Sequence, residues 1–462
     1  MKAASNSGLV DLTIDYLDAS GDGIARHRGD RISVPFTIPG ERVRVRLRPG
    51  HGDRLSSELL EILEPSPHRV VPPCPHFGPN AEPYGAPCGG CSWQHIAYPE
   101  QLRLKTALVD RLVRAALPHA PLARETIAGT DTRDPWGYRH KVHFVFGNAP
   151  HLVMGHYVRG SRRIIPVREC PVHDPRGNRL AFDLRDAYAR AGVSAAASGR
   201  GVLRSVAIRA GAHTPELMAT LVVANDDDKR LRTTTQRVVG RGDGADGRGP
   251  TSLHLNLHPR GDAFIFGRET RRLAGTDRMR EEVAGTSFLI SPTAFFQTNV
   301  HAADVLVRLV LDAVPDGADV LDLYAGVGLF ALPLARRGHH VAAIEENRAA
   351  VADGEASLRL NRIPPGQCRF VARSVESALT PTMPADVVIL DPPREGCAAP
   401  VVERLFGRLR PRRAVYVSCN PEALARDLRL IAPHSYTIRS LQPVDMFPHT
   451  AHVETVVILD RT

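Results

Sequence analysis

From about Ser291 to the C-terminus, short apolar runs alternate with stretches of helical character, and this alternation constrains the fold more than any other feature. The strand candidates are DVLDLY, HVAAIE, RFVA, DVVILD and RAVYVS. Strands separated by helices do not pair as hairpins; they form parallel strands joined by helical crossovers. We therefore predict a doubly wound, Rossmann-like α/β domain over residues 286–462.

The preceding chain has a different pattern and predicts two further domains. Residues 1–64 carry short apolar runs broken by glycine-rich turns such as SGDG and PGER, which is typical of a small OB-like β-barrel. In RVRVRLR, charged and apolar residues alternate as in a half-buried strand, whose arginines would face RNA or water. Residues 65–285 combine a helix at about 99–116 with recurring β-like runs, so we predict a central α+β domain.

The segment DVLDLYAGVGLF indicates a ligand site at the end of the first strand of the α/β domain. Asp322 lies near that strand end, and Gly326 and Gly328 follow in the turn before a helix. Open α/β sheets bind ligands at this edge, where glycines allow the backbone to approach closely. Glu345 ends the next strand 23 residues later, where a carboxylate can hold ribose hydroxyls. No third glycine follows, which favours S-adenosylmethionine over a dinucleotide, although the glycines alone would also serve a tight turn.

Two further strand ends carry reactive side chains. In DVVILDPPREGC, Asp391 follows an apolar strand, and two prolines prevent continuation as a helix. In RAVYVSCNPEAL, Cys419 follows another strand, and the Asn-Pro pair after it is typical of a helix N-terminus. The positive end of a helix dipole favours the thiolate, which is the nucleophilic form of cysteine. We expect Cys368 and Cys397, in contrast, to be small buried hydrophobes.

A thiolate and a carboxylate together suit methylation of carbon 5 of a pyrimidine. Carbon 5 of uracil is too weakly nucleophilic to take a methyl group from a sulfonium, but thiolate attack at carbon 6 generates an enolate that does so. A base must then remove the proton from carbon 5. Glu454, at the start of the final strand, is a candidate base, although a carboxylate there can equally be a solvated strand residue.

With these residues in view, nearly the whole chain resembles the RNA 5-methyluridine methyltransferases of bacteria. SPTAFFQTN, DLYAGVGLF, ILDPPREGC, YVSCNPEALARDL and DMFPHTAHVE are similar to that family's motifs and occur in the family's order. The resemblance implies a class I methyltransferase domain in which Cys419 is the nucleophile and Glu454 the base. It also implies a cofactor and substrate pocket lined by Gln297, Tyr324, Gly326, Glu345 and Asp391, with the flipped uracil stacked on Phe295 or Phe296.

The N-terminal segment LDASGDGIARHRGDRISVPFTIPGERV resembles a TRAM domain, an OB-like RNA-binding barrel found on these enzymes. Barrels of this kind bind nucleic acid along one strand face. The resemblance therefore implies that residues 1–64 contribute to RNA binding.

Four cysteines outside the α/β domain form a second candidate site. Cys88 and Cys91 form a C-x2-C pair in CGGCSWQH, with Cys74 upstream and Cys170 far downstream. On spacing alone the set is a zinc site, an iron–sulfur cluster or unconnected thiols. CGGCSWQH resembles the cluster-bearing branch of the family, which implies that the four cysteines ligate a 4Fe–4S cluster. The thirteen residues between Cys74 and Cys88 exceed the family's usual spacing, and we expect the insert FGPNAEPYGAP to be a loop.

Composition bears on partners and location. Basic residues exceed acidic ones by nine, which suits a polyanionic partner such as nucleic acid. Only four of them are lysines, so the arginine excess also fits a GC-rich genome. No run of about 18 apolar residues and no secretory signal occurs, which predicts a cytoplasmic protein that does not span a membrane. We expect a monomer.

These features together predict S-adenosylmethionine-dependent methylation of carbon 5 of a uridine in RNA. The cysteine set favours large-subunit ribosomal RNA over transfer RNA. Cytosine-5 methylation shares the thiolate chemistry but needs an acid that protonates the ring nitrogen, and the SCNP and HVE motifs argue against it. A non-catalytic iron–sulfur RNA-binding protein would not need Cys419, Glu454, Asp391 and Gln297 intact.

Overall fold

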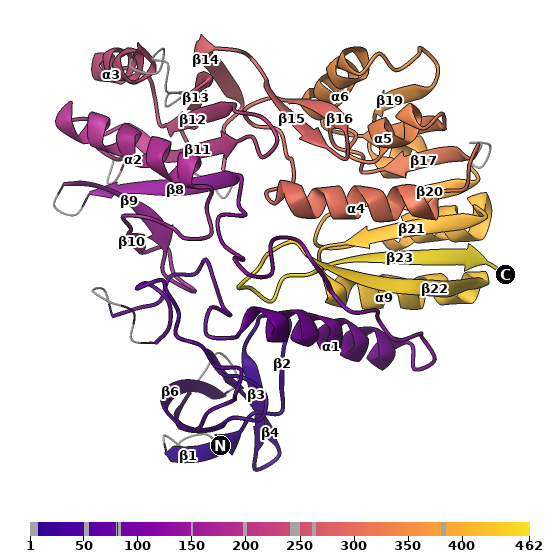
Figure 1. The fold of residues 1–462 in the computed structure, drawn as a ribbon, viewed down its shortest axis with the longest axis horizontal. Coiled ribbons are helices and arrows are strands. Elements are labelled where there is room, and N and C mark those ends of the chain that lie inside the picture. The colour runs from indigo at the N-terminus through magenta and orange to yellow at the C-terminus, as the bar shows by residue number, and fades with distance from the viewer. Residues whose placement is uncertain are drawn as a thin grey trace.

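The computed structural model describes residues 8–49, 55–79, 81, 85–148, 151–196, 201–240, 250–260, 265–379 and 385–462. Residue 80 and residues 82–84 of the predicted loop insert therefore lie outside the described residues. The described chain forms four β-sheets, each with its own set of strands (Figure 1). None of the described helices is both long enough and apolar enough to cross a membrane.

The N-terminal region is a six-stranded sheet. Its strand order is β1-β5-β6-β4-β3-β2, and the strands are β1 (Leu9–Thr13), β2 (Tyr16–Leu17), β3 (Gly23–His27), β4 (Asp30–Val34), β5 (Arg42–Pro49) and β6 (Leu55–Glu64). The two end strands, β1 and β2, are consecutive in the chain. The buried side chains of this sheet include Leu12, Ile32, Val43 and Val45.

The alternation predicted for RVRVRLR is present in β5. Val43 and Val45 are fully buried, whereas Arg42, Arg46 and Arg48 are exposed and Arg44, which lies between the two valines, is half-buried. The arginines pair with acids on the neighbouring strands: Arg44 Nε lies 2.9 Å from Asp11 Oδ1, and Arg46 Nη1 lies 3.0 Å from Glu58 Oε2. Exposed pairs of this kind contribute at most about 1 kcal/mol each. Their main effect is to neutralise this row of arginines.

The central region is a seven-stranded sheet in the order β10-β9-β8-β11-β12-β13-β14. Only β12 and β13 pair in parallel. The strands are β8 (Lys141–Asn148), β9 (Leu152–Tyr157), β10 (Ile164–Pro166), β11 (Leu203–Ala210), β12 (Leu217–Val223), β13 (Ser252–Leu257) and β14 (Glu269–Gly275), with helices α2 (Pro175–Arg190) and α3 (Lys229–Gly240). Leu180 and Leu184 of α2 share a core with Phe144 and Ile208 of the sheet. The Asp174 carboxylate caps α2 by accepting from two backbone N–H groups.

The C-terminal region contains an eight-stranded sheet in the order β19-β18-β17-β20-β21-β23-β22-β7. The strands are β17 (Asp319–Leu323), β18 (His340–Glu345), β19 (Cys368–Ala372), β20 (Val387–Leu390), β21 (Arg413–Ser418), β22 (Tyr436–Asp445), β23 (Glu454–Arg461) and β7 (Ile127–Ala128). The five predicted strands, β17 to β21, pair in parallel, and β23 runs antiparallel to both of its neighbours. The predicted doubly wound α/β architecture is thus confirmed.

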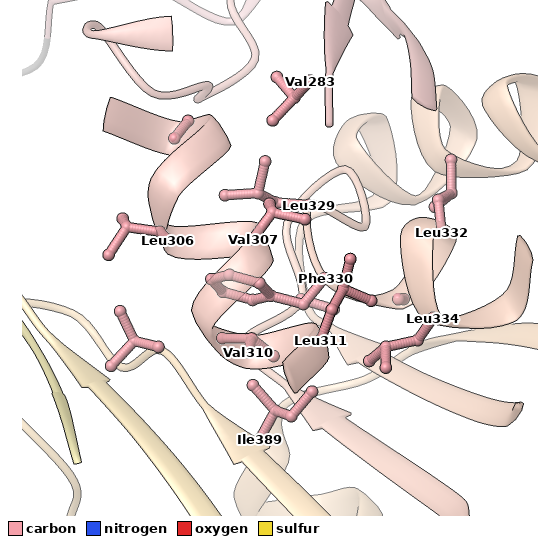
Figure 2. Close-up of a cluster of buried hydrophobic side chains, with 14 of the residues drawn as sticks. Val283, Leu306, Val307, Val310, Leu311, Leu329, Phe330, Leu332, Leu334 and Ile389 are labelled. Atoms are coloured by element: carbon pink, nitrogen blue, oxygen red, sulfur yellow. The ribbon is translucent and has the colours of Figure 1, made fainter. Parts of the chain in front are cut away.

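Helices cover both faces of this sheet (Figure 1). One face is covered by α4 (Val300–Ala313), α5 (Ala331–Arg336) and α6 (Arg348–Leu360), and the other by α1 (Tyr98–Ala116), α7 (Val375–Ala378), α8 (Ala399–Val402) with the π-helix η1 (Glu403–Leu409), and α9 (Pro421–Ile431), which ends in the 3-10 turn η2 (Ala432–His434). Along β20, Val387 and Ile389 enter the first layer, and Val388 and Leu390 enter the second. Figure 2 shows the first layer, where Leu306 and Val310 of α4 lie near Phe330 and Ile389. Each such buried aliphatic side chain stabilises the fold by about 1.5–3 kcal/mol.

Segments of the predicted middle part contribute to the C-terminal region. The helix predicted at 99–116 is α1, and its Val109 and Val113 share a core with Leu424 and Leu428 of α9. The hairpin β15 (Met279–Val283) and β16 (Thr286–Ile290) packs on α4 and α6. The short strand β7 pairs in parallel with β22 at the sheet edge. The predicted domain boundaries at 64/65 and 285/286 stay a prediction. Two segments of the predicted middle domain, α1 and β7, contact the C-terminal sheet.

Candidate active site

Three neighbouring strand ends bring the predicted catalytic residues together. Asp391 directly follows β20, Cys419 directly follows β21, and Glu454 begins β23. Ser418 pairs with Thr455 across the antiparallel strands β21 and β23. The next residues in this register are Cys419 and Glu454, which therefore lie opposite each other at the carboxyl edge of the parallel strands.

The helix after Cys419 begins as the sequence predicted. The Asn420 side chain accepts hydrogen bonds from the backbone N–H groups of Glu422 and Ala423, and Pro421 occupies the first helical position of α9. Asn420 Nδ2 also donates to the Arg394 carbonyl at 2.9 Å. One side chain therefore caps α9 and ties the loop after Asp391 to the loop that carries Cys419.

Burial sets the electrostatics of this cluster. Glu454 is 4% exposed, and burial together with Asp391 raises its pKa to about 8. Burial also raises the pKa of Asp391 to about 7. Arg394 opposes the shift at Glu454. Both carboxyl groups therefore titrate near neutral pH, which is the range in which a carboxylate is an effective proton acceptor.

The thiol of Cys419 departs from the sequence-based expectation. Burial, followed by the charges of Glu454 and Asp391, raises its pKa to about 12, and Arg394 opposes this shift. The predicted preference of the helix N-terminus for a thiolate is thus outweighed by burial and by two carboxyl groups whose positions the sequence did not fix. Added positive charge near these carboxyl groups would favour the thiolate.

The turn between β17 and α5 forms the predicted cofactor side of the site. The Gly326 N–H donates to Glu345 Oε2 at 2.9 Å, which joins the ends of β17 and β18. Gly326 has φ +56, and a Cβ there would meet no atom within 4 Å. Gly328 differs, because a Cβ there would collide with Leu332 and Phe370. Gly326 therefore faces open space, whereas the lack of a side chain at Gly328 lets Leu332 and Phe370 pack against it.

Asp322 and Tyr324 border the same turn. Asp322 is fully buried, and neither of its carboxylate oxygens has a hydrogen-bond partner among the described residues. Burial, together with Asp391, raises the pKa of Asp322 well above its usual value. Tyr324 has φ +60, a conformation that is rare for a bulky side chain. An unpartnered buried carboxylate beside an open turn fits a cationic or hydrogen-bond-donating ligand.

The two phenylalanines of SPTAFFQTN have different environments. Phe295 is 68% exposed, whereas Phe296 is 3% exposed and packs against Phe288 with ring centroids 5.5 Å apart. Phe296 is thus packed in the core, and its role in stacking on a substrate base stays a prediction. Phe295 remains available for that role. Gln297 follows with 8% exposure.

The central region holds this segment in place. Arg209 donates to the Ala294 carbonyl at 2.9 Å, and the His140 N–H donates to the Thr298 carbonyl at 2.7 Å. On the other side, Asn299 caps α4 and donates to the Met446 carbonyl at 3.1 Å. Contacts from both the central sheet and the loop before β23 therefore position Phe295 and Gln297.

The four outlying cysteines line one cavity of about 670 Å³. Burial raises the pKa of Cys88 to about 11 and raises that of Cys170 as well. Arg139 lies near Cys91 and Cys170, where its charge lowers their pKa values. Among the described residues no carboxylate forms an ion pair with Arg139. The structure thus places the four thiols together, beside a cation that would stabilise their ionised forms.

Arg394 and Arg139 are site residues that the sequence analysis missed. Arg394 lies in DPPREGC, three positions after Asp391, whereas Arg139 lies in WGYRHK, a segment that the sequence analysis did not single out. The motif position of Arg394 is a usable signal. Arg139 offers none, because its proximity to the cysteines depends on the tertiary fold.

The strand order, the single antiparallel strand β23 and the reactive groups at the carboxyl edge together define a methyltransferase-like α/β enzyme. Residues 280–462 match the family model described as tRNA (Uracil-5-)-methyltransferase. An uncharacterized RNA methyltransferase of Gloeobacter violaceus is 38% identical, with 98% of this chain and 96% of the relative covered. One of Synechocystis is 36% identical, with 98% and 95% covered.

A solved structure extends this likeness to the fold. The crystal structure of Pyrococcus abyssi tRNA (uracil-54, C5)-methyltransferase in complex with S-adenosyl-L-homocysteine has a TM-score of 0.77. It is 26% identical and covers 97% of this chain and 100% of its own. The chain therefore belongs to the RNA uracil-5-methyltransferase family and is an RNA methyltransferase.

Proposed function

We propose that this protein transfers the methyl group of S-adenosylmethionine to carbon 5 of a uracil in RNA, through a covalent bond between Cys419 and carbon 6. The observation that carries the proposal is the register of β21 and β23, which pairs Ser418 with Thr455 and so sets Cys419 opposite Glu454, beside Asp391. A nucleophile and a proton acceptor are thereby held at one sheet edge, at positions fixed by strand register. Both are needed to activate carbon 5 and then restore the ring.

The reaction follows from these residues. Cys419 Sγ, as the thiolate, bonds to carbon 6, and the electrons of the double bond move to form an enolate. S-adenosylmethionine supplies the electrophilic methyl group that carbon 5 accepts. The Glu454 carboxylate then takes the proton from carbon 5, the electrons of that bond restore the ring double bond, and Cys419 leaves as a thiolate. Glu454 finally releases the proton to water.

The residues around the β17 turn fit the cofactor. The Glu345 carboxylate accepts from the Gly326 N–H through Oε2 and from the Asn347 N–H through Oε1, which fixes its orientation, and the remaining lone pairs of these oxygens would accept from ribose hydroxyls. Asp322 is a buried and Asp391 a half-buried carboxyl group, and a cationic sulfonium or amino group would pair with them. Positive charge there would also lower the pKa of Cys419 toward the thiolate. Gln297 and Tyr324 complete the proposed pocket, and Phe295 is the proposed stacking residue for the uracil.

The mechanism is tested with RNA in which uridine is replaced by 5-fluorouridine. Fluorine at carbon 5 cannot leave as a cation, so the reaction stops with Cys419 bonded to RNA. We expect an adduct that survives denaturation for the wild type and for Cys368→Ala, a control at another buried cysteine. We expect no adduct for Cys419→Ala. An adduct that forms without Cys419 would refute the proposal.

The RNA target has two candidates. The four cysteines favour large-subunit ribosomal RNA, whereas the likeness to the P. abyssi transfer RNA enzyme over 97% of this chain favours transfer RNA. Mass-spectrometric mapping of 5-methyluridine in cells with and without the gene separates them. A site lost from the large ribosomal subunit supports the first, and a site lost from transfer RNA supports the second. Loss of 5-methylcytosine instead would contradict uracil as the substrate.

We further propose that Cys74, Cys88, Cys91 and Cys170 hold a 4Fe–4S cluster. They share one cavity beside Arg139, and no three of their sulfur atoms lie within 4.8 Å of one another among the described residues. A single zinc ion needs its four ligands closer together than the corners of a cluster do. His156 and His173 lie within 4.8 Å of Cys170 and form the alternative set for a single ion.

Metal analysis distinguishes these sites. Protein purified without oxygen should be brown and hold about four irons. Both features should vanish in Cys88→Ala/Cys91→Ala and persist in His156→Ala. A colourless protein whose bound zinc is lost in His156→Ala would refute the cluster.

The remaining assignments concern the domains. We propose that residues 1–64 form a TRAM-like RNA-binding barrel, residues 65–285 the cysteine-bearing central domain and residues 286–462 the methyltransferase domain. The six-stranded sheet with its buried apolar side chains supports the first assignment. RNA that binds along β5 must compete with the acids that neutralise its arginines. A cytoplasmic monomer stays our prediction, which light scattering and fractionation test.

A further inference from the structure

Two histidines and an aspartate meet where the central sheet faces α4. His301 and Asp304 lie three residues apart on α4 and so share one face of that helix. His213 comes from the turn between β11 and β12. A ligand atom of each residue lies within 4.8 Å of a ligand atom of both others, and His213 Nε2 lies 3.5 Å from Asp304 Oδ2.

The other polar atoms of two of these side chains are already engaged. His213 Nδ1 lies 2.7 Å from the Glu282 carbonyl, so this nitrogen carries the proton and leaves Nε2 as an acceptor. Asp304 Oδ1 accepts from the Ala284 N–H at 2.6 Å, which leaves Oδ2 directed at the histidines. A backbone carbonyl behind an imidazole is the usual support of a metal-ligating histidine, because it fixes the tautomer and the ring orientation.

The histidine rings are also held in position. The His301 ring makes edge contacts with His213 and with His140, at centroid distances of 5.3 and 5.2 Å. The backbone of His213 is fixed as well, because its N–H donates to the buried Glu281 carboxylate at 3.1 Å. The set is therefore oriented by contacts outside itself.

We propose that His213, His301 and Asp304 form a site for a divalent transition-metal ion, with zinc as the best-matched candidate. Two imidazoles and one carboxylate form a donor set that zinc binds well, and hard ions such as Mg²⁺ prefer oxygen ligands alone. Three protein ligands leave a fourth position for water. His213 and Asp304 line a cavity of about 700 Å³ that gives solvent access to that position.

Such an ion would join two parts of the chain. His213 belongs to a turn of the central sheet, whereas His301 and Asp304 belong to the first half of α4. The α4 cap, Asn299, directly follows the segment that carries Phe295 and Gln297. The ion would therefore fix the central sheet relative to the segment that borders the proposed active site, without touching the reacting groups.

Zinc uptake by the full-length protein tests the site. We compare the wild type with His301→Ala and with the control His434→Ala. His434 lies outside the proposed site, and its Nε2 lies 3.6 Å from Glu403 Oε2. The wild type and the control should bind one Zn²⁺ more than His301→Ala in equilibrium dialysis. Zinc should raise the melting temperature of the first two but not that of His301→Ala. Asp304→Asn, which keeps the side-chain volume, gives the same answer should His301→Ala fold poorly.

Cobalt separates this site from the cysteines. Co²⁺ bound by nitrogen and oxygen ligands absorbs weakly in the visible range, whereas thiolate ligands add an intense sulfur-to-cobalt band. We expect the weak spectrum to be lost in His301→Ala and retained in Cys88→Ala/Cys91→Ala. Equal zinc uptake and equal thermal response in the wild type, the control and His301→Ala would overturn the proposal.

Discussion

The imidazole of His449 stacks on the indole of Trp136 with ring centroids 3.8 Å apart. Every polar atom of His449 is bonded as well: its carbonyl accepts from the N–H groups of Ser92 and Trp93, its N–H donates to Gln101, and its ring nitrogens contact Gln101 and the Pro135 carbonyl. His449 lies in the loop between β22 and β23, five residues before Glu454. Ser92 and Trp93, directly after Cys91, thus help to hold the loop that leads into β23 and the proposed base.

We predict that His449→Ala lowers kcat for RNA methylation about tenfold to a hundredfold. Loss of the imidazole frees the loop, and a shift of about 1 Å in a catalytic group can cost a hundredfold in rate. KM for S-adenosylmethionine should change little, because the cofactor side lies on other strands. His449→Gln, which keeps one polar contact, should recover part of the rate. A simple loss of folded protein would instead lower kcat and the active fraction in parallel.

The raised pKa values of Asp391 and Glu454 predict a pH dependence of stability. Folding favours the protonated forms, so this stabilisation is complete below the unfolded pKa of about 4 and is lost as pH rises through about 7 and 8. The free energy of unfolding should fall over this interval. Asp391→Asn/Glu454→Gln should flatten the fall. kcat/KM should rise with pH over the same range, because the base acts as its carboxylate.

Removal of the proposed base should trap the reaction after methyl transfer. Glu454→Gln keeps the shape of the side chain but cannot take the proton from carbon 5, so Cys419 cannot leave. We expect a methylated RNA–protein adduct on ordinary RNA, detected by denaturing gel electrophoresis and mass spectrometry. Glu454→Gln/Cys419→Ala should form none. Full turnover by Glu454→Gln would assign the proton transfer to another group.

The two glycines of the β17 turn should respond differently to alanine. Gly326→Ala places its methyl group in open space, so it should fold, with a cost of about 1–2 kcal/mol for the left-handed backbone. It should nevertheless weaken binding of S-adenosylhomocysteine in calorimetry. Gly328→Ala meets Leu332 and Phe370 and should lose substantially more stability. Equal melting temperatures for the two variants would contradict this assignment.

A fully buried ion pair links α1 to β22. Lys105 Nζ contacts Asp445 and donates to the Phe447 carbonyl at 3.0 Å, and both charged side chains have no exposed surface. Lys105→Met should cost about 3–5 kcal/mol, because it leaves Asp445 buried without a countercharge. Lys105→Met/Asp445→Leu should be more stable than Lys105→Met alone. Denaturant unfolding measures the free energy of unfolding of both variants. Additive losses of this free energy would argue against direct coupling of Lys105 and Asp445.

The sequence predicted the α/β sheet and the proximity of two proposed site residues for a physical reason. Carboxyl ends of parallel strands meet at one edge, so Asp391 and Cys419 had to be near each other once DVVIL and RAVYVS were recognised as strands. The position of Glu454 could not be predicted in this way, because the direction of its strand and the strand beside it decide whether Glu454 faces Cys419. The antiparallel register with Ser418 settles this, and no local pattern encodes it.

Other features depend on tertiary packing that single-chain patterns do not contain. Phe295 and Phe296 are adjacent in an irregular segment without periodicity, so only the packing against Phe288 distinguishes them. The raised pKa of Cys419 arises from burial and from carboxyl groups that lie at other strand ends. His213 and His301 are distant in sequence, and their meeting requires the central sheet to face α4.

The packing of α1 on α9 has a consequence for biosynthesis. The ribosome completes α1 at residue 116 but does not begin α9 until residue 421, roughly 300 residues later. At about 5–20 residues per second this interval is roughly 15–60 s. Val109 and Val113 lack their native partners for that time, so the nascent chain carries an exposed apolar helix that a chaperone can bind. The unfinished chain, which contains α1 but not yet α9, is therefore more prone to aggregation than the finished enzyme.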